Sequence, residues 1–111
     1  MDQKNTKISE DFMKKVRGFL RITEENDEII NAEITSLINS CRKDLMRNGI
    51  TSEKANSEED SLVESAILLY LKAEFGLDNK NYERYRSSYE TLRNELSLTD
   101  EYVSEVVDNV G

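Results

Sequence analysis

The segment LVESAILLYLKAEFG, from Leu62 to Gly76, contains the most apolar run of the chain. Between Ala66 and Leu71 the only polar side-chain group is the Tyr70 hydroxyl, although 34% of the whole chain is charged. Apolar residues cover nearly the full circumference of a helix drawn through this segment, which is typical of a helix enclosed by other helices. The sequence therefore predicts a central buried helix over about 58–75, ended by Gly76.

Two helices are predicted before this segment. Ser9 is followed by two acids, a pattern typical of a helix N-terminus, and predicts a short helix that reaches about Leu20. Apolar residues at steps of three and four then form a stripe that continues to about Arg47. Asn48-Gly49 supplies the stop signal for this long helix. The stripe is the most regular helical pattern in the chain.

The remaining segments are predicted from shorter signals. Residues 50–56 are expected to form a loop, and Ser57 with the acids after it resembles a capping box that opens the central helix. A seam of tyrosines and leucines predicts a last helix over Tyr82–Leu96. We expect the tyrosines of this seam to pack inside the monomer. The alternative is that they lie at an interface with another protein.

These elements predict a small all-α fold of four helices, two long and two short. We expect a flexible N-terminus over 1–8, a single helical domain over 9–96 and a C-terminal tail over 97–111. The core residues are expected on the stripe of the long helix and on the central helix: Ile34, Leu37, Cys41, Ala66, Leu68, Leu71 and Phe75.

The composition argues against common enzyme classes. The chain has no histidine and a single cysteine, so it lacks the most frequent general base and the usual ligands of zinc and iron-sulfur sites. Cys41 lies on the apolar stripe, where a thiol is expected to be neutral and unreactive. The acidic segments do not have the spacing of a calcium loop, and the four glycines are not clustered. No enzyme activity, metal or cofactor is therefore expected.

The charge distribution points to partners other than nucleic acid. The net charge is -8, and the whole excess lies after residue 48. Such a balance makes tight DNA binding unfavourable, and no helix in the second half is basic enough for a helix-turn-helix recognition helix. Neither a secretory signal nor a run long enough to cross a membrane is found, so we expect a soluble protein made in a cytoplasm.

The C-terminal segment after the last helix is a candidate interaction site. It carries apolar residues between acids, is too short to fold alone, and could gain order on a partner or simply fray without a role. The candidate docking residues are Leu98, Tyr102, Val103, Val106, Val107 and Val110.

The order of these elements resembles the tailed-bacteriophage head-tail connector family. VRGFLRITEENDEIINAEITSLINSCRKDL, from Val16 to Leu45, is similar to that family's short helix, acidic connector and long amphipathic helix. LVESAILLYLKAEFG resembles its central buried helix, and YERYRSSYETLRNELSLTDEY, from Tyr82 to Tyr102, resembles its closing helix and Leu-Ser-Leu turn. The resemblance covers residues 12–102, with departures at Gly18 and at Phe75-Gly76.

This resemblance implies a structural role in head completion. Members of the family form a ring of about a dozen subunits beneath the portal after DNA packaging, extend the DNA channel and meet the next connector or stopper protein. Double-stranded DNA would pass through the ring without specific binding. The resemblance also implies assembly in the host bacterial cytoplasm, final location at the head-tail interface of the virion, and a C-terminal tail that docks on the portal.

Two further hypotheses complete the sequence-based interpretation. Acids of the last helix, Glu83, Glu90 and Glu95, could face the channel, because a negative wall would repel DNA phosphates and let the duplex slide. The alternative function is an acidic helical regulator that binds a host or phage enzyme, which would form one small complex instead of a ring.

Overall fold

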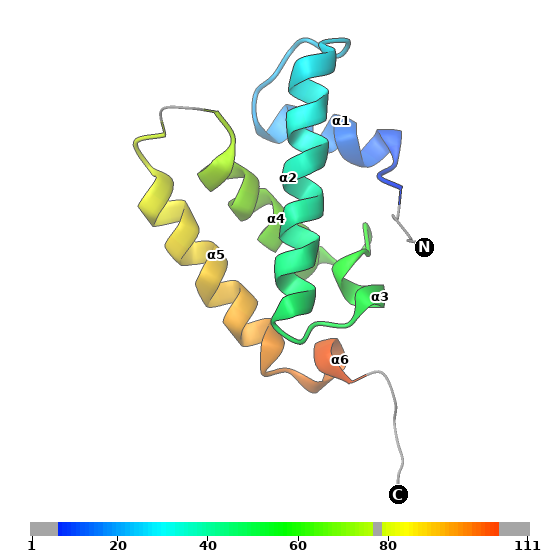
Figure 1. Cartoon of the computed structure of the whole chain (residues 1–111), viewed down its shortest axis with the longest axis vertical. Helices are drawn as coiled ribbons and strands as arrows, with labels where there is room; N and C mark the ends of the chain where they lie inside the picture. The colour runs from blue at the N-terminus through cyan, green and yellow to red at the C-terminus, as the bar shows by residue number, and fades with distance from the viewer. Residues whose placement is uncertain (1–6, 77–78, 105–111) are drawn as a thin grey trace, which may run out of the picture.

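The structure, a computed structural model, describes residues 7–76 and 79–104, and these residues form helices, turns and loops without a strand. The helices are α1 (Glu10–Phe19), α2 (Glu28–Arg47), α3 (Ser52–Ala55), α4 (Ser61–Glu74), α5 (Tyr82–Ser97) and α6 (Asp100–Val103). The predicted all-α class is confirmed, and α1, α2, α4 and α5 are the four predicted helices. In Figure 1 the long α2 stands at the centre, with α4 and α5 on one side and α1 across its upper part.

The helix starts follow from side-chain caps. The Ser9 hydroxyl accepts a hydrogen bond from the Phe12 backbone N–H at 3.0 Å, as the sequence predicts for α1. Asp60, rather than Ser57, caps α4, because its carboxylate accepts bonds from Leu62 and Val63 N–H at 3.0 Å. The Ser57 hydroxyl instead accepts from the Asp60 N–H and shapes the turn before the helix. The central helix therefore begins a few residues later than predicted.

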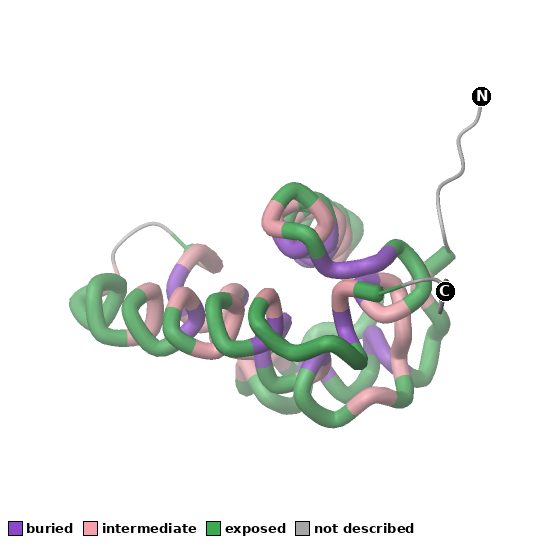
Figure 2. Tube along the Cα trace, turned by 90° about the horizontal axis from the view of Figure 1, so that it is seen from below, coloured by how far each residue is buried: buried purple, intermediate pink, exposed green. Residues whose placement is uncertain are grey.

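The core forms where α1, α2, α4 and α5 meet. Ile34, Cys41, Ala66 and Leu71 are fully buried as predicted, whereas Leu37, Leu68 and Phe75 are half-buried and pack against the cluster. Figure 2 shows the buried residues on the inward sides of the helices and exposed residues on the outward sides.

The central helix is less enclosed than its composition suggests. α4 packs along α5 and against α2, but Leu62 keeps 45% of its surface exposed and Leu69 is only half-buried. These two residues are seven apart and share one side of the helix. α4 is therefore covered on two sides and leaves an apolar strip partly open.

A short helix replaces part of the predicted loop. Thr51 caps α3 through its hydroxyl, which accepts from the Lys54 N–H at 3.2 Å, and Ala55 is fully buried. Four residues are too few for an apolar period, so the sequence pattern could not reveal this element.

Two helices end in the same backbone motif. After α2, Ile50 N–H donates to the Leu45 carbonyl and Gly49 N–H to that of Met46, with Gly49 at φ 99°. After α1, Ile22 N–H donates to the Arg17 carbonyl while Arg21, not glycine, takes the left-handed position at φ 63°. A non-glycine residue there costs about 1–2 kcal/mol. This motif sets the direction in which the acidic connector leaves α1.

Candidate docking surface

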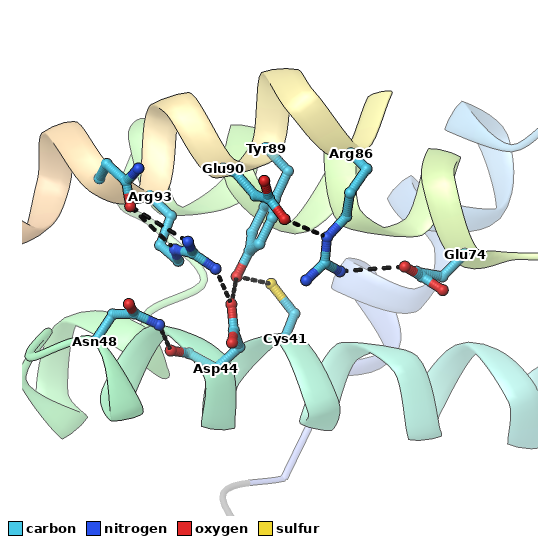
Figure 3. Close-up of polar contacts among 9 residues, drawn as sticks. Cys41, Asp44, Asn48, Glu74, Arg86, Tyr89, Glu90 and Arg93 are labelled. Carbon is cyan, nitrogen blue, oxygen red and sulfur yellow. Dashed lines mark hydrogen bonds and ion pairs between the residues drawn. The ribbon is translucent and has the colours of Figure 1, made fainter. Parts of the chain in front are cut away.

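A polar network joins α5 to α2 on the buried side of the fold (Figure 3). The Tyr89 hydroxyl donates to the Asp44 carboxylate at 2.7 Å, and the Arg93 guanidinium donates to the same oxygen at 3.0 Å. The Cys41 thiol donates to the Tyr89 hydroxyl oxygen at 3.8 Å. Because a buried polar group is costly when it lacks a partner, these contacts fix the position of α5 on α2.

The network explains the protonation of its members. Burial acts to raise the pKa of Asp44, but hydrogen bonds from Tyr89 and Arg93 outweigh it and hold that pKa below its usual value. Burial raises the pKa of the Cys41 thiol to about 12. Cys41 is therefore a neutral core thiol, as predicted, and this network is structural.

The tyrosine seam of α5 is divided between core and surface. Tyr89 is fully buried and its ring packs edge-on against Tyr70, with centroids 5.1 Å apart. Tyr85 is half-buried, and Tyr82 keeps 40% of its surface exposed. The interpretation of packing inside the monomer therefore holds for Tyr89, while the other two tyrosines remain available for contact.

The three proposed channel acids do not form one equivalent set. Glu83 and Glu95 are exposed, whereas Glu90 is half-buried and bonded to the Arg86 guanidinium at 2.9 Å. At 100° per residue, Glu95 lies about 120° around the helix from Glu83. Arg84, Arg86 and Arg93 also lie on α5 and balance its three glutamates. Taken by itself, α5 is not a negative wall.

The predicted tail begins with an ordered segment. Tyr102 on α6 is 5% exposed, and its hydroxyl donates to the Asp60 carboxylate at 3.0 Å. Its backbone carbonyl accepts from the Thr51 N–H at 2.9 Å, so α6 closes over the α3 region. Tyr102 is thus a core residue that is not available for docking. Likewise, Ile8, in the segment predicted to be flexible, packs against the core.

The other tail candidates differ in exposure. Leu98 is 85% exposed, and Val103 is half-buried. Val106, Val107 and Val110 lie outside the described residues. Leu98 is therefore the described tail residue with the most apolar surface to offer a partner.

Two buried charges, Arg42 and Arg17, were missed by the sequence analysis. Arg42 lies on α2 with 2% of its surface exposed, and its guanidinium is 3.7 Å from the Glu58 carboxylate. Glu58 also accepts bonds from the Ser9 backbone N–H and hydroxyl, at 2.9 and 2.6 Å. This contact ties the start of α1 to the turn before α4. The only available sequence signal was that Arg42 follows directly after a stripe position.

An open groove of about 430 Å³ lies between α1 and α2. Arg17 lines it, but the guanidinium is already held by the Asn31 side chain at 3.1 Å and by Glu10 at 3.8 Å. Within the described ranges no cluster of three metal-binding side chains occurs, and none of the helices there is long and apolar enough to cross a membrane.

The fold and these sites describe a structural, interaction-type helical protein. Its polar clusters hold helices together, and its exposed features are apolar residues beside charges. The family model described as "Phage connector protein" matches residues 12–103, which is most of the chain. The chain therefore belongs to the phage connector protein family, and its role is a structural one of the connector type. No curated protein and no solved structure matches it.

Proposed function

We propose that this chain is a subunit of a head-tail connector ring that sits on the portal after DNA packaging and extends the DNA channel. Membership of the phage connector family carries the proposal. A net charge of -8 supports it, because mutual repulsion keeps subunits apart until a template gathers them. The partners would be the portal protein on one side and a connector or stopper protein on the other.

Within this proposal, Leu98 and the residues after Ser104 make the contact with the portal. Leu98 lies between α5 and α6 and exposes 85% of its surface, so docking would bury an apolar group that water now surrounds. α6 holds this end of the chain through Tyr102. A docking residue next to an anchored element loses less conformational freedom on binding.

The channel part of the proposal now rests on two acids. Glu83 and Glu95 are exposed and form no ion pair within the described ranges, whereas the Glu90 charge is offset by Arg86. We propose that Glu83 and Glu95 contribute to a negative channel surface and that Glu90 adds little to it. The assembled protein would reside at the head-tail interface of the virion, after synthesis in the host bacterial cytoplasm.

Co-sedimentation with purified portal rings tests the docking proposal. The wild-type chain should sediment with the rings, and Leu98→Asp should weaken this binding by at least about tenfold, because a charge replaces a buried apolar contact. Tyr82→Asp is a matched control, since Tyr82 is an exposed aromatic residue at the other end of α5 from Leu98. Wild-type binding that Leu98→Asp leaves unchanged would rule out Leu98 as a portal contact.

A further inference from the structure

Two cations and two aromatic rings from three helices form a row on the surface. The Lys72 ammonium of α4 lies 5.3 Å from the Phe19 ring centre on α1 and 5.8 Å from that of Tyr85 on α5. The Arg84 guanidinium lies 5.7 Å from the Tyr85 ring centre. We call Phe19, Lys72, Tyr85 and Arg84 the ring-cation row. Each distance is short enough for a favourable cation–π contact.

The cations of this row have no carboxylate partner within the described part of the chain. Lys15, Arg86 and Arg93 all form ion pairs at about 3 Å, with Glu64, Glu74 and Asp44 in turn. Among the residues that the structure describes, the charged groups of Lys72 and Arg84 contact aromatic rings and no carboxylate. In a chain with eight more acids than bases, two adjacent cations without an acid form a local positive site.

Apolar surface continues from the row along α4. Leu69 lies three residues before Lys72, on the same side of the helix, and Leu62 lies one heptad further back. Leu62 is 45% exposed, Leu69 is half-buried, and Phe19 is 38% exposed. A partner on this surface would need both acidic and apolar groups.

The chain itself offers such a surface at the start of α2. Glu24, Glu25 and Glu28 are exposed beside Ile29, which keeps 81% of its surface exposed, and we call these four residues the acidic corner. The three glutamates form no ion pair within the described ranges. The acidic corner therefore complements the ring-cation row in both charge and apolar content.

Hydrogen bonds with nearby side chains hold the backbone of the acidic corner. The Asp27 carboxylate accepts bonds from the Ile29 and Ile30 backbone N–H groups at 3.0 and 3.1 Å. The Asn31 side chain donates to the Glu25 backbone carbonyl at 2.9 Å. A surface that is ordered before binding loses less entropy when a partner docks.

We propose that the ring-cation row of one copy binds the acidic corner of a second copy. The proposal gives the connector ring its subunit contact and rests on that proposed function for its role in the virion. Because row and corner share no residue, the proposed contact joins two unlike sites, so that each copy offers its row to one neighbour and its corner to another. Such heterologous contacts close into rings when the rotation permits.

A second copy fits the row better than a nucleic acid does. Rings and cations together also suit single-stranded nucleic acid, but nucleic acid has no aliphatic side chain to cover the partly open apolar surface at Leu62 and Leu69. The acidic corner of a second copy supplies three carboxylates and one isoleucine. A second copy would also be present at high local concentration during assembly on a template. The acidic partner is therefore the chain itself.

Charge reversal tests the contact, with self-association of the full-length chain measured by sedimentation velocity at low and high salt. The protein concentration is raised to about 1 mM, which is the effective concentration expected when a template gathers the subunits. The row variant is Lys72→Glu/Arg84→Glu, and the corner variant is Glu25→Lys/Glu28→Lys. Matched controls reverse exposed charges elsewhere, in Lys14→Glu/Lys43→Glu and Glu53→Lys/Glu59→Lys. Ile29→Ser removes the apolar contact at a site too exposed to affect folding.

The wild-type chain and both controls should associate, and their association should be weaker at high salt. The row variant and the corner variant should each associate at least about tenfold more weakly than the wild type. Ile29→Ser should weaken it as well. Mixing the row variant with the corner variant should restore association, because each reversed surface then meets its complement. Combining both reversals in one chain should do the same.

Several results would overturn the contact. The first is a wild-type chain that stays monomeric at about 1 mM. The second is a charge reversal that leaves self-association unchanged. The third is a mixture of the two variants that fails to restore association although both variants melt like the wild type. Binding of a labelled single-stranded oligonucleotide that the row variant loses would assign the row to nucleic acid instead. Portal binding is measured separately, so the contact can fail while the connector function stands.

Discussion

The two sides of α4 differ in what covers them, although both are apolar. On one side Ile67 and Leu71 are completely buried against neighbouring helices, whereas on the other Leu62 is 45% exposed. A helix that is apolar around its circumference is expected to be enclosed. In this chain the enclosure is incomplete within the described residues, and the open side of α4 carries the apolar surface for which we propose a contact between chains.

The buried side should be far less tolerant of charge than the open side. Leu71→Asp should abolish cooperative thermal unfolding, because an unpaired buried charge costs roughly 3–5 kcal/mol and the lost leucine packing adds roughly 2–5 kcal/mol. Leu62→Asp should melt within a few degrees of the wild type. Thermal melts followed by circular dichroism compare the pair, and equal melting of the two variants would contradict the distinction between the two sides.

The Asp44 network should add a pH-dependent part to the stability of the buried side. Asp44→Asn should lower the free energy of unfolding at pH 7 by about 2 kcal/mol, since Asp44 accepts bonds from Tyr89 and Arg93. Because folding lowers the pKa of Asp44, its contribution is present above about pH 4, the unfolded-state pKa, and fades as the pH falls through the folded value.

Denaturant unfolding at a series of pH values measures this effect. The difference between wild type and Asp44→Asn should shrink below about pH 4. The Asp44→Asn variant should keep some acid sensitivity, because the pKa of Asp60 is also lowered. Burial of Asp60 acts to raise that pKa, but hydrogen bonds from Val63, Tyr102 and Leu62 outweigh the effect of burial. A difference that stays constant down to pH 2 would refute the role given to the Asp44 carboxylate.

Truncation to alanine should rank three leucines by their burial. Leu71→Ala should cost roughly 2–5 kcal/mol in free energy of unfolding, as full burial predicts. The half-buried Leu68 should lose about half as much, and the exposed Leu62 should lose under about 0.5 kcal/mol. Chemical denaturation of the three variants gives the ranking. An equal loss of free energy of unfolding in Leu62→Ala and Leu71→Ala would contradict the difference between the two sides of α4.

A small effect on stability is also expected at Lys72. Lys72→Gln removes two cation–π contacts at a partly exposed site, so the free energy of unfolding should fall by less than about 1 kcal/mol. Its self-association should nevertheless weaken, if the open side of α4 is a contact surface. A large loss of stability in denaturant unfolding would place Lys72 in the folding core instead.

Local signals made the four main helices predictable. The Ser9 cap and the apolar stripe of α2 depend on contacts between residues three or four positions apart, so both helices could be predicted from the spacing of residues alone. The same holds for the neutral Cys41 thiol, whose place on the stripe indicated burial.

The missed features depend on contacts between distant residues. Tyr102 is buried where Asp60, 42 residues away, accepts a hydrogen bond from its hydroxyl. Arg42 is buried where Glu58 approaches it from the turn before α4. The ring-cation row likewise needs three helices to converge. Apolar spacing indicates that a residue can be covered, but it does not indicate which segment covers it.

Electron microscopy of portal rings from the same phage, with and without added chain, would show whether the chain assembles on the portal. We expect additional density as a coaxial ring on the portal, with α5 lining part of the channel and adjacent subunits in contact through α4. The result that would contradict it is an unchanged portal ring in the presence of folded chain at a concentration well above that of the portal.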